Sequence, residues 1–317
     1  MQSLMLYGRL LSRAAANSVQ NYAASSEIHS YSKRKLACEP VSSNQQKQLQ
    51  FLTASCGFPK DFTKPSHLIK KGQFGEDAYF STKNHTADAI GVADGVGGWK
   101  TYGVDSSVFS CTLMKSCEHL VNTGQFNPKE PERIIARSFY DLIECKEEIN
   151  GSSTACIMVL DKSDQTVHTA NIGDSGFLVV RSGEVLHRSE EQIHYFNTPH
   201  QLSQPPSDQS FQVLSDSPDT ADTSSFKVQE GDLILLATDG LFDNVPDNMI
   251  INELSKLKDC NREKIQATVN SLALQARVLA FDSSYMSPFS KRAQQHGINT
   301  IGGKPDDITI ILALVST

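Results

Sequence analysis

A short apolar run that ends at an acidic residue is the feature that most constrains the fold. Residues 89–93 read Ala-Ile-Gly-Val-Ala and are followed at once by Asp94 and Gly95. A continuous apolar run with turn residues at its end predicts a buried strand, so Asp94 is expected at a strand terminus that faces a cleft. Gly95 lets the chain turn without a Cβ clash and brings its carbonyl oxygen close to whatever Asp94 holds.

The same pattern recurs, which argues against the simpler interpretation of each Asp-Gly pair as an ordinary turn. Other apolar runs meet acids at Asp239-Gly240, at Asp306-Asp307 and at Glu76-Asp77. Taken singly, each acid is as readily interpreted as a cap, a turn residue or a solvated side chain. Carboxylates crowded together repel one another unless cations neutralise them, and Mg2+ and Mn2+ prefer oxygen ligands. The set therefore predicts a two-metal carboxylate site.

The motifs occur in an order that resembles a known family. Glu76-Asp77, Asp94-Gly95, residues 151–155 (Gly-Ser-Ser-Thr-Ala), residues 171–175 (Asn-Ile-Gly-Asp-Ser), residues 237–240 (Ala-Thr-Asp-Gly) and residues 306–309 (Asp-Asp-Ile-Thr) follow one another along the chain. Each motif is weak alone, but the ordered set resembles the metal-dependent protein phosphatases, the type 2C serine/threonine family, over about residues 60–317. The sequence after Asp94 is more similar to the mitochondrial branch typified by the T-cell activation protein phosphatase 2C-like protein.

The resemblance implies a mechanism and a set of ligands. A water that bridges two divalent metals, Mg2+ or Mn2+ and two per chain, would attack the phosphoryl group, so that no Ser or Cys nucleophile is needed. The metal preference stays open. Asp94 would bridge both ions, and the catalytic acids would be Asp94, Asp239 and Asp306. The metal ligands implied are Glu76, Asp94, the Gly95 carbonyl, Asp239 and Asp306.

Further residues are candidates for supporting roles. Asp77 is a candidate for orienting a metal-bound water, with a surface acid at a strand end as the alternative. Asp307 stands where the family usually has Asn and is ranked below Asp306. Asp174 is expected to be structural, hydrogen-bonding within a tight turn. Glu148 lies near the place of a third-metal acid, but it is not clearly in register.

The chain departs from the family pattern at the expected general acid and at the phosphate-binding arginine. The family usually has His directly after the bridging Asp-Gly, where this chain has Val96. His67 and His85 are candidates for protonating the leaving group, with a metal-bound water as the alternative. The family arginine before the Glu-Asp pair is missing, and Lys70 or Lys71 could supply a cation there, although as a point charge rather than a bidentate fork.

Charge and cysteine usage exclude several other functions. The net charge of −7 argues against a nucleic-acid partner, whose phosphates would be repelled. The seven cysteines form no Cys-x-x-Cys pair and fit neither a disulfide framework nor a zinc site, so reduced thiols are expected. None has Arg six residues later, as a cysteine phosphatase requires. No stretch is apolar enough for a membrane span.

The first 45 residues differ in composition from the rest. Arg9 and Arg13 occur without any acid in residues 1–26, and apolar residues there recur at helical spacing. This composition is typical of a mitochondrial transit peptide, with an unstructured tail as the alternative. Residues 1–45 are therefore interpreted as a transit peptide with a polar linker, and residues 55–317 as the phosphatase domain. We expect a mitochondrial protein, with the matrix favoured.

The order of expected elements predicts the fold class. Strands at 75–80 and 89–93 precede two helices within 104–121 and 131–143, and a meander of strands then runs from 153 to 187. Residues 189–225 are expected to be a flap or loop insertion. A strand at 233–238, helices from 246 and over 262–281, and a strand at 308–315 follow. Helices packed outside antiparallel sheets suit an α+β fold, and the resemblance implies a four-layer αββα sandwich with two antiparallel β-sheets flanked by helix pairs.

Two hypotheses follow. The first is a monomeric, mitochondrial, metal-dependent phosphatase that hydrolyses phosphoserine and phosphothreonine in phosphoprotein substrates. The second is a binding or scaffold protein that kept the fold and lost catalysis, as the missing His and Arg would suggest. The intact acids at Asp94, Asp239 and Asp306 oppose the second hypothesis, because crowded carboxylates without metal destabilise a fold.

Overall fold

A computed structural model of the 317-residue chain describes residues 48–61, 71–207, 213–257 and 261–317. The predicted transit peptide of residues 1–45 lies outside the described residues, as do His67 and Lys70. The described part of the chain contains no helix with both the length and the apolar character needed to cross a lipid bilayer.

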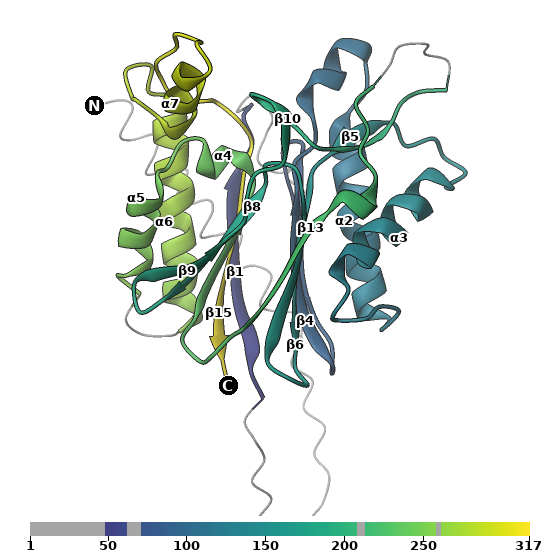
Figure 1. Ribbon diagram of the computed structural model, residues 1–317, viewed down its shortest axis with the longest axis vertical. Helices are drawn as coiled ribbons and strands as arrows, with labels where there is room; N and C mark the ends of the chain where they lie inside the picture. Colours follow the sequence, from purple (N-terminus) through teal and green to yellow (C-terminus); the bar gives the residue numbers. More distant parts are fainter. Residues whose placement is uncertain (1–47, 62–70, 208–212, 258–260) are drawn as a thin grey trace, which may run out of the picture. The chain divides into compact units, whose positions relative to one another are not determined.

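Two antiparallel sheets face each other in the centre of the fold (Figure 1). The five-stranded sheet has the order β1-β15-β14-β8-β9, and its strands are Gln50–Phe58, Ile308–Ser316, Leu233–Ala237, Gly176–Arg181 and Glu184–Arg188. The six-stranded sheet has the order β13-β7-β6-β4-β3-β2, and its strands are Asp222–Lys227, Thr166–Ile172, Ala155–Asp161, Ala87–Ala93, Asp77–Lys83 and Gln73–Phe74. Short strands β5 (Gly151–Ser153) and β12 (Leu202–Gln204) pair with each other, as do β10 (Ile193–Tyr195) and β11 (Thr198–Pro199).

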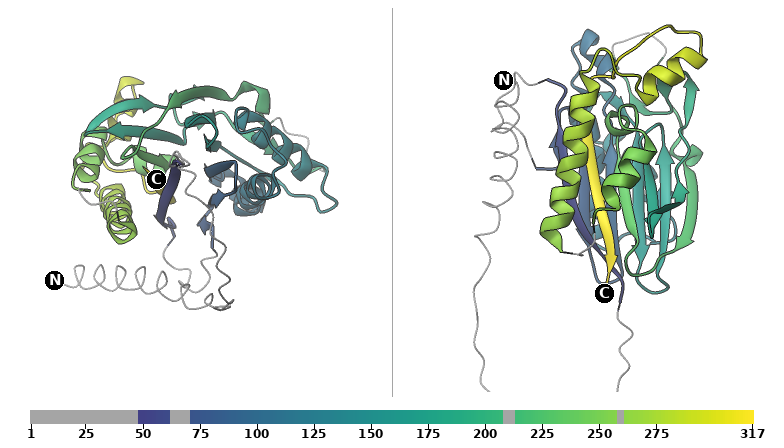
Figure 2. Two further views of the ribbon diagram at one scale, coloured as in Figure 1. Left: turned by 90° about the horizontal axis from the view of Figure 1, so that it is seen from below. Right: turned by 90° about the vertical axis from the view of Figure 1, so that its left-hand side faces the viewer.

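A pair of helices covers the outer face of each sheet, as Figures 1 and 2 show. Helices α2 (Ser106–Asn122) and α3 (Pro131–Ile143) pack on the six-stranded sheet, while α5 (Asp247–Leu254) and α6 (Arg262–Ala280) pack on the five-stranded sheet. Asp105 caps α2 by accepting a hydrogen bond from the Ser107 amide, and Pro131 opens α3, where its missing N–H costs nothing. The predicted four-layer αββα sandwich is confirmed. The smaller elements are η2 (Gly97–Tyr102), η3 (Pro218–Thr220), α4 (Asp239–Phe242) and α7 (Pro288–Gln295).

Three apolar layers hold the sandwich together. Alternate residues of β4 point to opposite faces, so Ala89 packs toward α2 and α3 while Ile90 and Val92 pack between the sheets. The third layer lies between the five-stranded sheet and α6, around Leu272. Because both faces of the inner strands are covered, β4 and β6 are buried along their whole length, and their sequences are apolar apart from Asp88 and Asp161.

Antiparallel pairing brings the acidic strand ends to one end of the sandwich. Ala93 at the end of β4 lies opposite Ala78 at the start of β3, and Ala155 at the start of β6 lies opposite Ile172 at the end of β7. In the other sheet Ala237 at the end of β14 lies opposite Ile310 near the start of β15. The acids next to these strand ends therefore meet at this end of the sandwich, which we call the acidic edge: Glu76, Asp77, Asp94, Asp174, Asp239, Asp306 and Asp307.

Two predicted boundaries differ from the structure. β1 begins at Gln50, before the predicted domain start at residue 55, and its buried Phe51 belongs to the layer between the sheets. The polar residues before it masked this edge strand, which pairs with β15. The segment 189–225, predicted to be a flap or loop insertion, contains β10, β11, β12, η3 and the first residues of β13. β13 escaped prediction because most of its side chains face solvent at the sheet edge, as in Ser224 and Ser225.

Candidate active site

Three carboxylates from different strand ends converge at the centre of the acidic edge. Single oxygen atoms of Asp94, Asp174 and Asp239 all lie within 4.8 Å of one another. Asp94 follows β4, where its amide donates a hydrogen bond to Thr154 Oγ1 and its carbonyl oxygen accepts one from the Thr154 amide. Asp239 opens α4 directly after β14. Oδ1 of Asp174 and Oδ1 of Asp239 are buried and have no hydrogen-bond partner among the described residues.

A buried lysine occupies one side of this group. Lys304 Nζ donates to Asp239 Oδ2, lies 2.7 Å from Asp243 Oδ2 and lies 3.5 Å from Asp306 Oδ2. The Lys304 side chain is 16% exposed, so these interactions are largely shielded from water. Arg292 holds the other oxygen of Asp243. This half of the acidic group is therefore compensated by the chain's own cations.

Glu76, Asp77 and Asp307 form the adjoining side. The Glu76 amide donates to Asp307 Oδ2 at 2.7 Å, and Thr238 Oγ1 donates to Asp77 Oδ2 at 2.8 Å. Lys100 from η2 lies 2.8 Å from Glu76 Oε2. Oε1 of Glu76 and Oδ1 of Asp77 are buried without a partner in the described part of the chain. Glu76 and Asp77 thus each have one oxygen held in place and one left for a ligand.

Gly95 lies where a side chain would not fit. A Cβ atom built on Gly95 would be 2.6 Å from the Glu76 carbonyl oxygen and 3.0 Å from that of Ser106. The glycine therefore allows the backbone after Asp94 to approach the turn between β2 and β3 that carries Glu76.

Burial and mutual repulsion perturb the pKa values of these carboxyl groups. Withdrawal from water and repulsion by Asp239 raise the pKa of Asp94 well above its usual value. Burial and the same repulsion raise the pKa of Asp306 to about 6. Burial opposes ionisation of Asp239 too, but the Lys304 ammonium lowers the pKa of Asp239 overall. Because carboxylates disfavour one another here, the group is electrostatically suited to a cation.

The raised pKa of Asp306 predicts an unusual pH dependence of stability in chelator. A carboxyl whose pKa is higher in the folded state stabilises the fold below its unfolded pKa near 3.8, and that stabilisation is lost as the pH rises through about 6. We expect the unfolding free energy of the wild type, minus that of Asp306→Asn, to fall by about 2 kcal/mol between pH 4 and pH 7. Urea unfolding in EDTA at each pH measures this difference. A difference that is flat or rises with pH would contradict the prediction.

Asp307 has a structural role that its sequence position did not reveal. It follows Asp306, but it turns toward Gly75 and accepts the backbone amides of Glu76 and Lys60. It therefore fixes the turn between β2 and β3 that carries Glu76. A Cβ atom on Gly75, whose φ is +69°, would lie 2.0 Å from Asp307 Oδ1.

Gly75→Ala is expected to destabilise the protein by displacing Asp307. Gly124 has the same φ of +69° and open space around its Cβ position, so Gly124→Ala measures the backbone strain alone. We expect Gly75→Ala to lower the unfolding free energy by about 1–3 kcal/mol more than Gly124→Ala does. Denaturant unfolding of the two variants checks this, and equal losses would show that the Asp307 contact is not rigid.

Several predicted candidates lie away from the acids. Lys71 is exposed, and the lysines that contact the acids in the described part of the chain are Lys60, Lys100 and Lys304. His85 occupies the turn between β3 and β4, at the opposite end of β4 from Asp94. The length of this extended strand separates His85 from Asp94 by about 20 Å. Glu148 is exposed and accepts a hydrogen bond from the Ser207 amide. Lys71 as the phosphate cation therefore stays a prediction, whereas His85 lies too far from Asp94 to be the general acid.

Sequence reasoning also missed residues at the site. Asp174 was expected to hydrogen-bond within its turn, but its carboxylate lies with Asp94 and Asp239. Lys100 and Lys304 were missed because their partners Glu76 and Asp239 are 24 and 65 residues away in sequence. For Lys304, its closeness to Asp306 in sequence was the one available indication.

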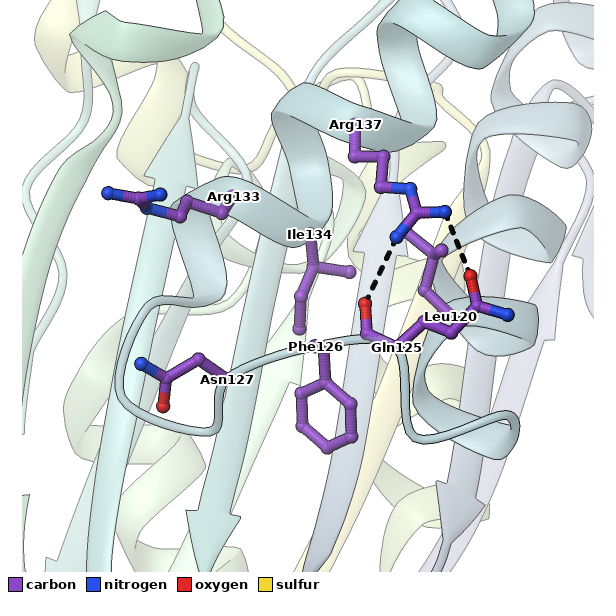
Figure 3. Close-up of a pocket in the computed structure, with 7 residues that line it drawn as sticks. All are labelled: Leu120, Gln125, Phe126, Asn127, Arg133, Ile134 and Arg137. Atoms are coloured by element: carbon purple, nitrogen blue, oxygen red, sulfur yellow. Dashed lines mark hydrogen bonds between the residues drawn. The ribbon is translucent and has the colours of Figure 1, made fainter.

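A pocket of about 380 Å3 lies elsewhere, between the end of α2 and the start of α3 (Figure 3). It is lined by Leu120, Gln125, Phe126, Asn127, Arg133, Ile134 and Arg137. Figure 3 shows Arg137 turned toward Gln125, to whose carbonyl and side-chain oxygens it donates. Leu120 lies about 21 Å along α2 from Ser106, at the rise of a helix, and so the pocket is separate from the acidic edge.

Comparison with known proteins identifies the family. Residues 65–277 match the family model described as Protein phosphatase 2C. The chain is similar to Protein phosphatase PTC7 homolog from Danio rerio, 52% identical over 317 residues that cover 100% of this chain and 99% of the relative. It is also similar to the protein of the same name from Homo sapiens, 58% identical over 266 residues that cover 84% of this chain and 87% of the relative.

Solved structures agree with the fold. The photosystem II phosphatase PBCP matches with a TM-score of 0.69 and 27% identity, covering 84% of this chain and 99% of that one. The catalytic domain of the phosphatase PstP, solved with two manganese ions, matches with a TM-score of 0.51 and 15% identity, covering 85% and 99%. With the converging carboxylates, these likenesses identify the chain as a phosphoprotein phosphatase that belongs to the protein phosphatase 2C family.

Proposed function

We propose that the chain hydrolyses phosphoserine and phosphothreonine in mitochondrial proteins, using two divalent cations at the acidic edge. The observation that carries the proposal is the convergence of carboxylates from separate strand ends, with oxygens that are buried and lack partners within the described residues. Buried polar atoms are normally paired, so a set of unpartnered carboxylate oxygens indicates that these oxygens bind cations.

The donor set fits Mg2+ or Mn2+. Every candidate ligand is an oxygen, from Asp94, Asp174 and Asp239 at the centre and from Glu76 and Gly95 at the side. Hard divalent ions select carboxylates and carbonyls in this way. When bound, such a pair of cations would lower the pKa of a water and polarise the phosphoryl group for in-line attack.

The chain's own residues would position the substrate and the ligands. Thr154 fixes the backbone of Asp94 on both sides, and Asp307 fixes that of Glu76. Lys100, whose side chain is 62% exposed beside Glu76, can pair with a phosphoryl oxygen. It is better placed for this than Lys71. Val96 provides no proton, so the leaving alcohol would take its proton from water.

Phosphate release from phosphopeptides tests the activity. The purified full chain is expected to dephosphorylate phosphoserine and phosphothreonine peptides with Mn2+ or Mg2+ and to stop when EDTA is added. Metal restored in excess should recover the rate. Release that continues in EDTA would exclude a metal-dependent reaction, and no release from a broad panel by folded protein would favour the scaffold hypothesis.

Metal stoichiometry tests the proposed number of cations. Equilibrium dialysis with Mn2+ is expected to give two ions per chain in the wild type and a lower number in Asp239→Asn, because Asp239 contributes to the central group. Binding of none, in a folded sample, would count against the mechanism.

The mitochondrial part of the proposal rests on residues 1–45 alone. Arg9 and Arg13 without acids in residues 1–26 are typical of an import signal. A fusion of residues 1–45 to a reporter should enter isolated mitochondria, and the paired substitutions Arg9→Gln and Arg13→Gln should prevent entry. Import of both fusions, or of neither, would contradict the proposal that residues 1–45 are a mitochondrial import signal.

A further inference from the structure

Two histidines and an aspartate meet in the segment between β9 and β13. His194 lies in β10, His200 directly follows β11, and Asp216 lies before η3. One ligand atom from each lies within 4.8 Å of the others. His194 Nε2 is 3.0 Å from Asp216 Oδ2, and His200 Nδ1 is 3.9 Å from Asp216 Oδ1. Ligands of tetrahedral zinc are about 3.3 Å apart, so small side-chain rotations would bring these atoms onto one ion.

One nitrogen of this cluster, Nδ1 of His200, lacks a hydrogen-bond partner among the described residues. This nitrogen is buried and faces Asp216. The two imidazole rings are stacked, with centroids 4.3 Å apart. A metal ion placed between these side chains would give His200 Nδ1 a partner. Asp216 Oδ1 does not, because a separation of 3.9 Å is too long for a hydrogen bond.

The charge of Asp216 is also uncompensated by lysine or arginine. A second cluster of similar composition, Asp161, Asp164 and His168, has Lys129 3.4 Å and Lys227 3.9 Å from Asp164. The ion pairs recorded for Asp216 in the described residues involve only His194 and His200. The cluster around Asp216 therefore still attracts a cation, whereas Lys129 and Lys227 already compensate the cluster around Asp164.

Hydrogen bonds that involve the backbone already hold two of the three ligands, His200 and Asp216, in position. The His200 amide donates to the Gln192 carbonyl at 2.9 Å, and the Asp216 amide donates to the Gln201 carbonyl at 2.8 Å. The Gln201 amide in turn donates to Asp216 Oδ2 at 2.8 Å. Preorganised ligands lose little conformational entropy on binding, which favours a specific site.

From this geometry we infer that His194, His200 and Asp216 bind one Zn2+ ion, with water in the remaining position. Imidazole nitrogen selects zinc and related transition metals, whereas the oxygen-only acidic edge suits Mg2+ or Mn2+. The two sites therefore differ in metal class, and the inference does not depend on the catalytic proposal.

The zinc ion would fasten a segment that touches the acidic edge at two places. Beside one ligand, the Gln192 amide donates to the Gly173 carbonyl at 2.9 Å, and Gly173 precedes Asp174. Beside another, the Gln201 side chain accepts a hydrogen bond from Ser152 Oγ, whose neighbour Ser153 donates to the Asp94 carbonyl at 2.8 Å. The ion is thus a structural clamp on the chain that supports Asp94 and Asp174.

Zinc binding in the presence of magnesium tests the inference. The full chain, stripped of metal, is loaded with millimolar Mg2+ to fill the oxygen-ligated edge and then titrated calorimetrically with Zn2+. One further equivalent per chain is expected. Co2+ absorption in the visible range reports whether nitrogen ligands take part. Asp216→Asn, which keeps an acceptor for the Gln201 amide, and His200→Ala should each weaken this equivalent at least about tenfold.

His168→Ala is the matched control, because His168 also has a buried unpartnered nitrogen but belongs to the other cluster. It should leave zinc uptake unchanged. Hydrogen exchange at the Gln192, Gln201 and Asp216 amides should slow on zinc addition in the wild type and not in His200→Ala. Absence of the extra equivalent in folded wild type, its persistence in both site variants, or its loss in His168→Ala would overturn the inference.

Discussion

Asp94→Asn is expected to abolish phosphate release while making the metal-free protein more stable. Asp94 lies within 4.8 Å of Asp174 and Asp239, so its charge is unfavourable without a cation, and burial with this repulsion raises the pKa of Asp94. The amide keeps the shape but removes the charge. We expect a fall of at least about a thousandfold in kcat, by analogy with the loss of other groups that stabilise transition-state charge, and a higher Tm in EDTA.

Asp247→Asn is the matched control for this prediction. Asp247 is a partly exposed acid at the start of α5 that pairs with Arg188 at 2.6 Å. Its loss should leave kcat unchanged and alter stability by less than about 1 kcal/mol. Calorimetric unfolding with and without Mn2+ completes the test, because Mn2+ should raise the Tm of the wild type and of Asp247→Asn but not that of Asp94→Asn. Wild-type activity in Asp94→Asn would remove this carboxylate from the mechanism.

The inner strands and their terminal acids were predictable because burial on both faces leaves a simple pattern. β4 and β14 both end in apolar runs, and the acids that follow them, Asp94 and Asp239, interrupt the pattern abruptly. Antiparallel pairing then brings the strand ends together without further information. The ordered motifs added the layer arrangement, which the apolar pattern alone did not specify.

Elements at sheet edges and contacts across the edge were not predictable in the same way. β13 has five exposed side chains in six residues, and so it reads as a polar loop. Helix α7 has few apolar residues, and Asp307 accepts backbone amides although it is adjacent to Asp306 in sequence. Such details depend on the direction in which a side chain points at a strand end. The neighbouring residues in the sequence do not determine that direction.

Lys304→Met is expected to destabilise the metal-free protein by about 3–5 kcal/mol, the range seen when one partner of a buried ion pair is removed. The carboxylates of Asp239, Asp243 and Asp306 surround its ammonium group. Burial favours the neutral amine, but these acids raise the pKa of Lys304 well above its usual value, so it is charged at neutral pH. Methionine keeps most of the volume and leaves the carboxylates to repel one another. Urea unfolding in EDTA measures the loss.

Lys100→Met is the control for Lys304→Met, because it removes a different lysine that also pairs with an acid of the site. Lys100 pairs with Glu76 at 2.8 Å, but its side chain is 62% exposed, and so its loss should cost less than about 1 kcal/mol. Mg2+ should also distinguish the variants, because a divalent cation can neutralise the acids that Lys304 leaves behind. The stabilisation by Mg2+ should therefore be larger in Lys304→Met than in the wild type. Equal losses in the two lysine variants would mean that water, not Lys304, screens the acids at this edge.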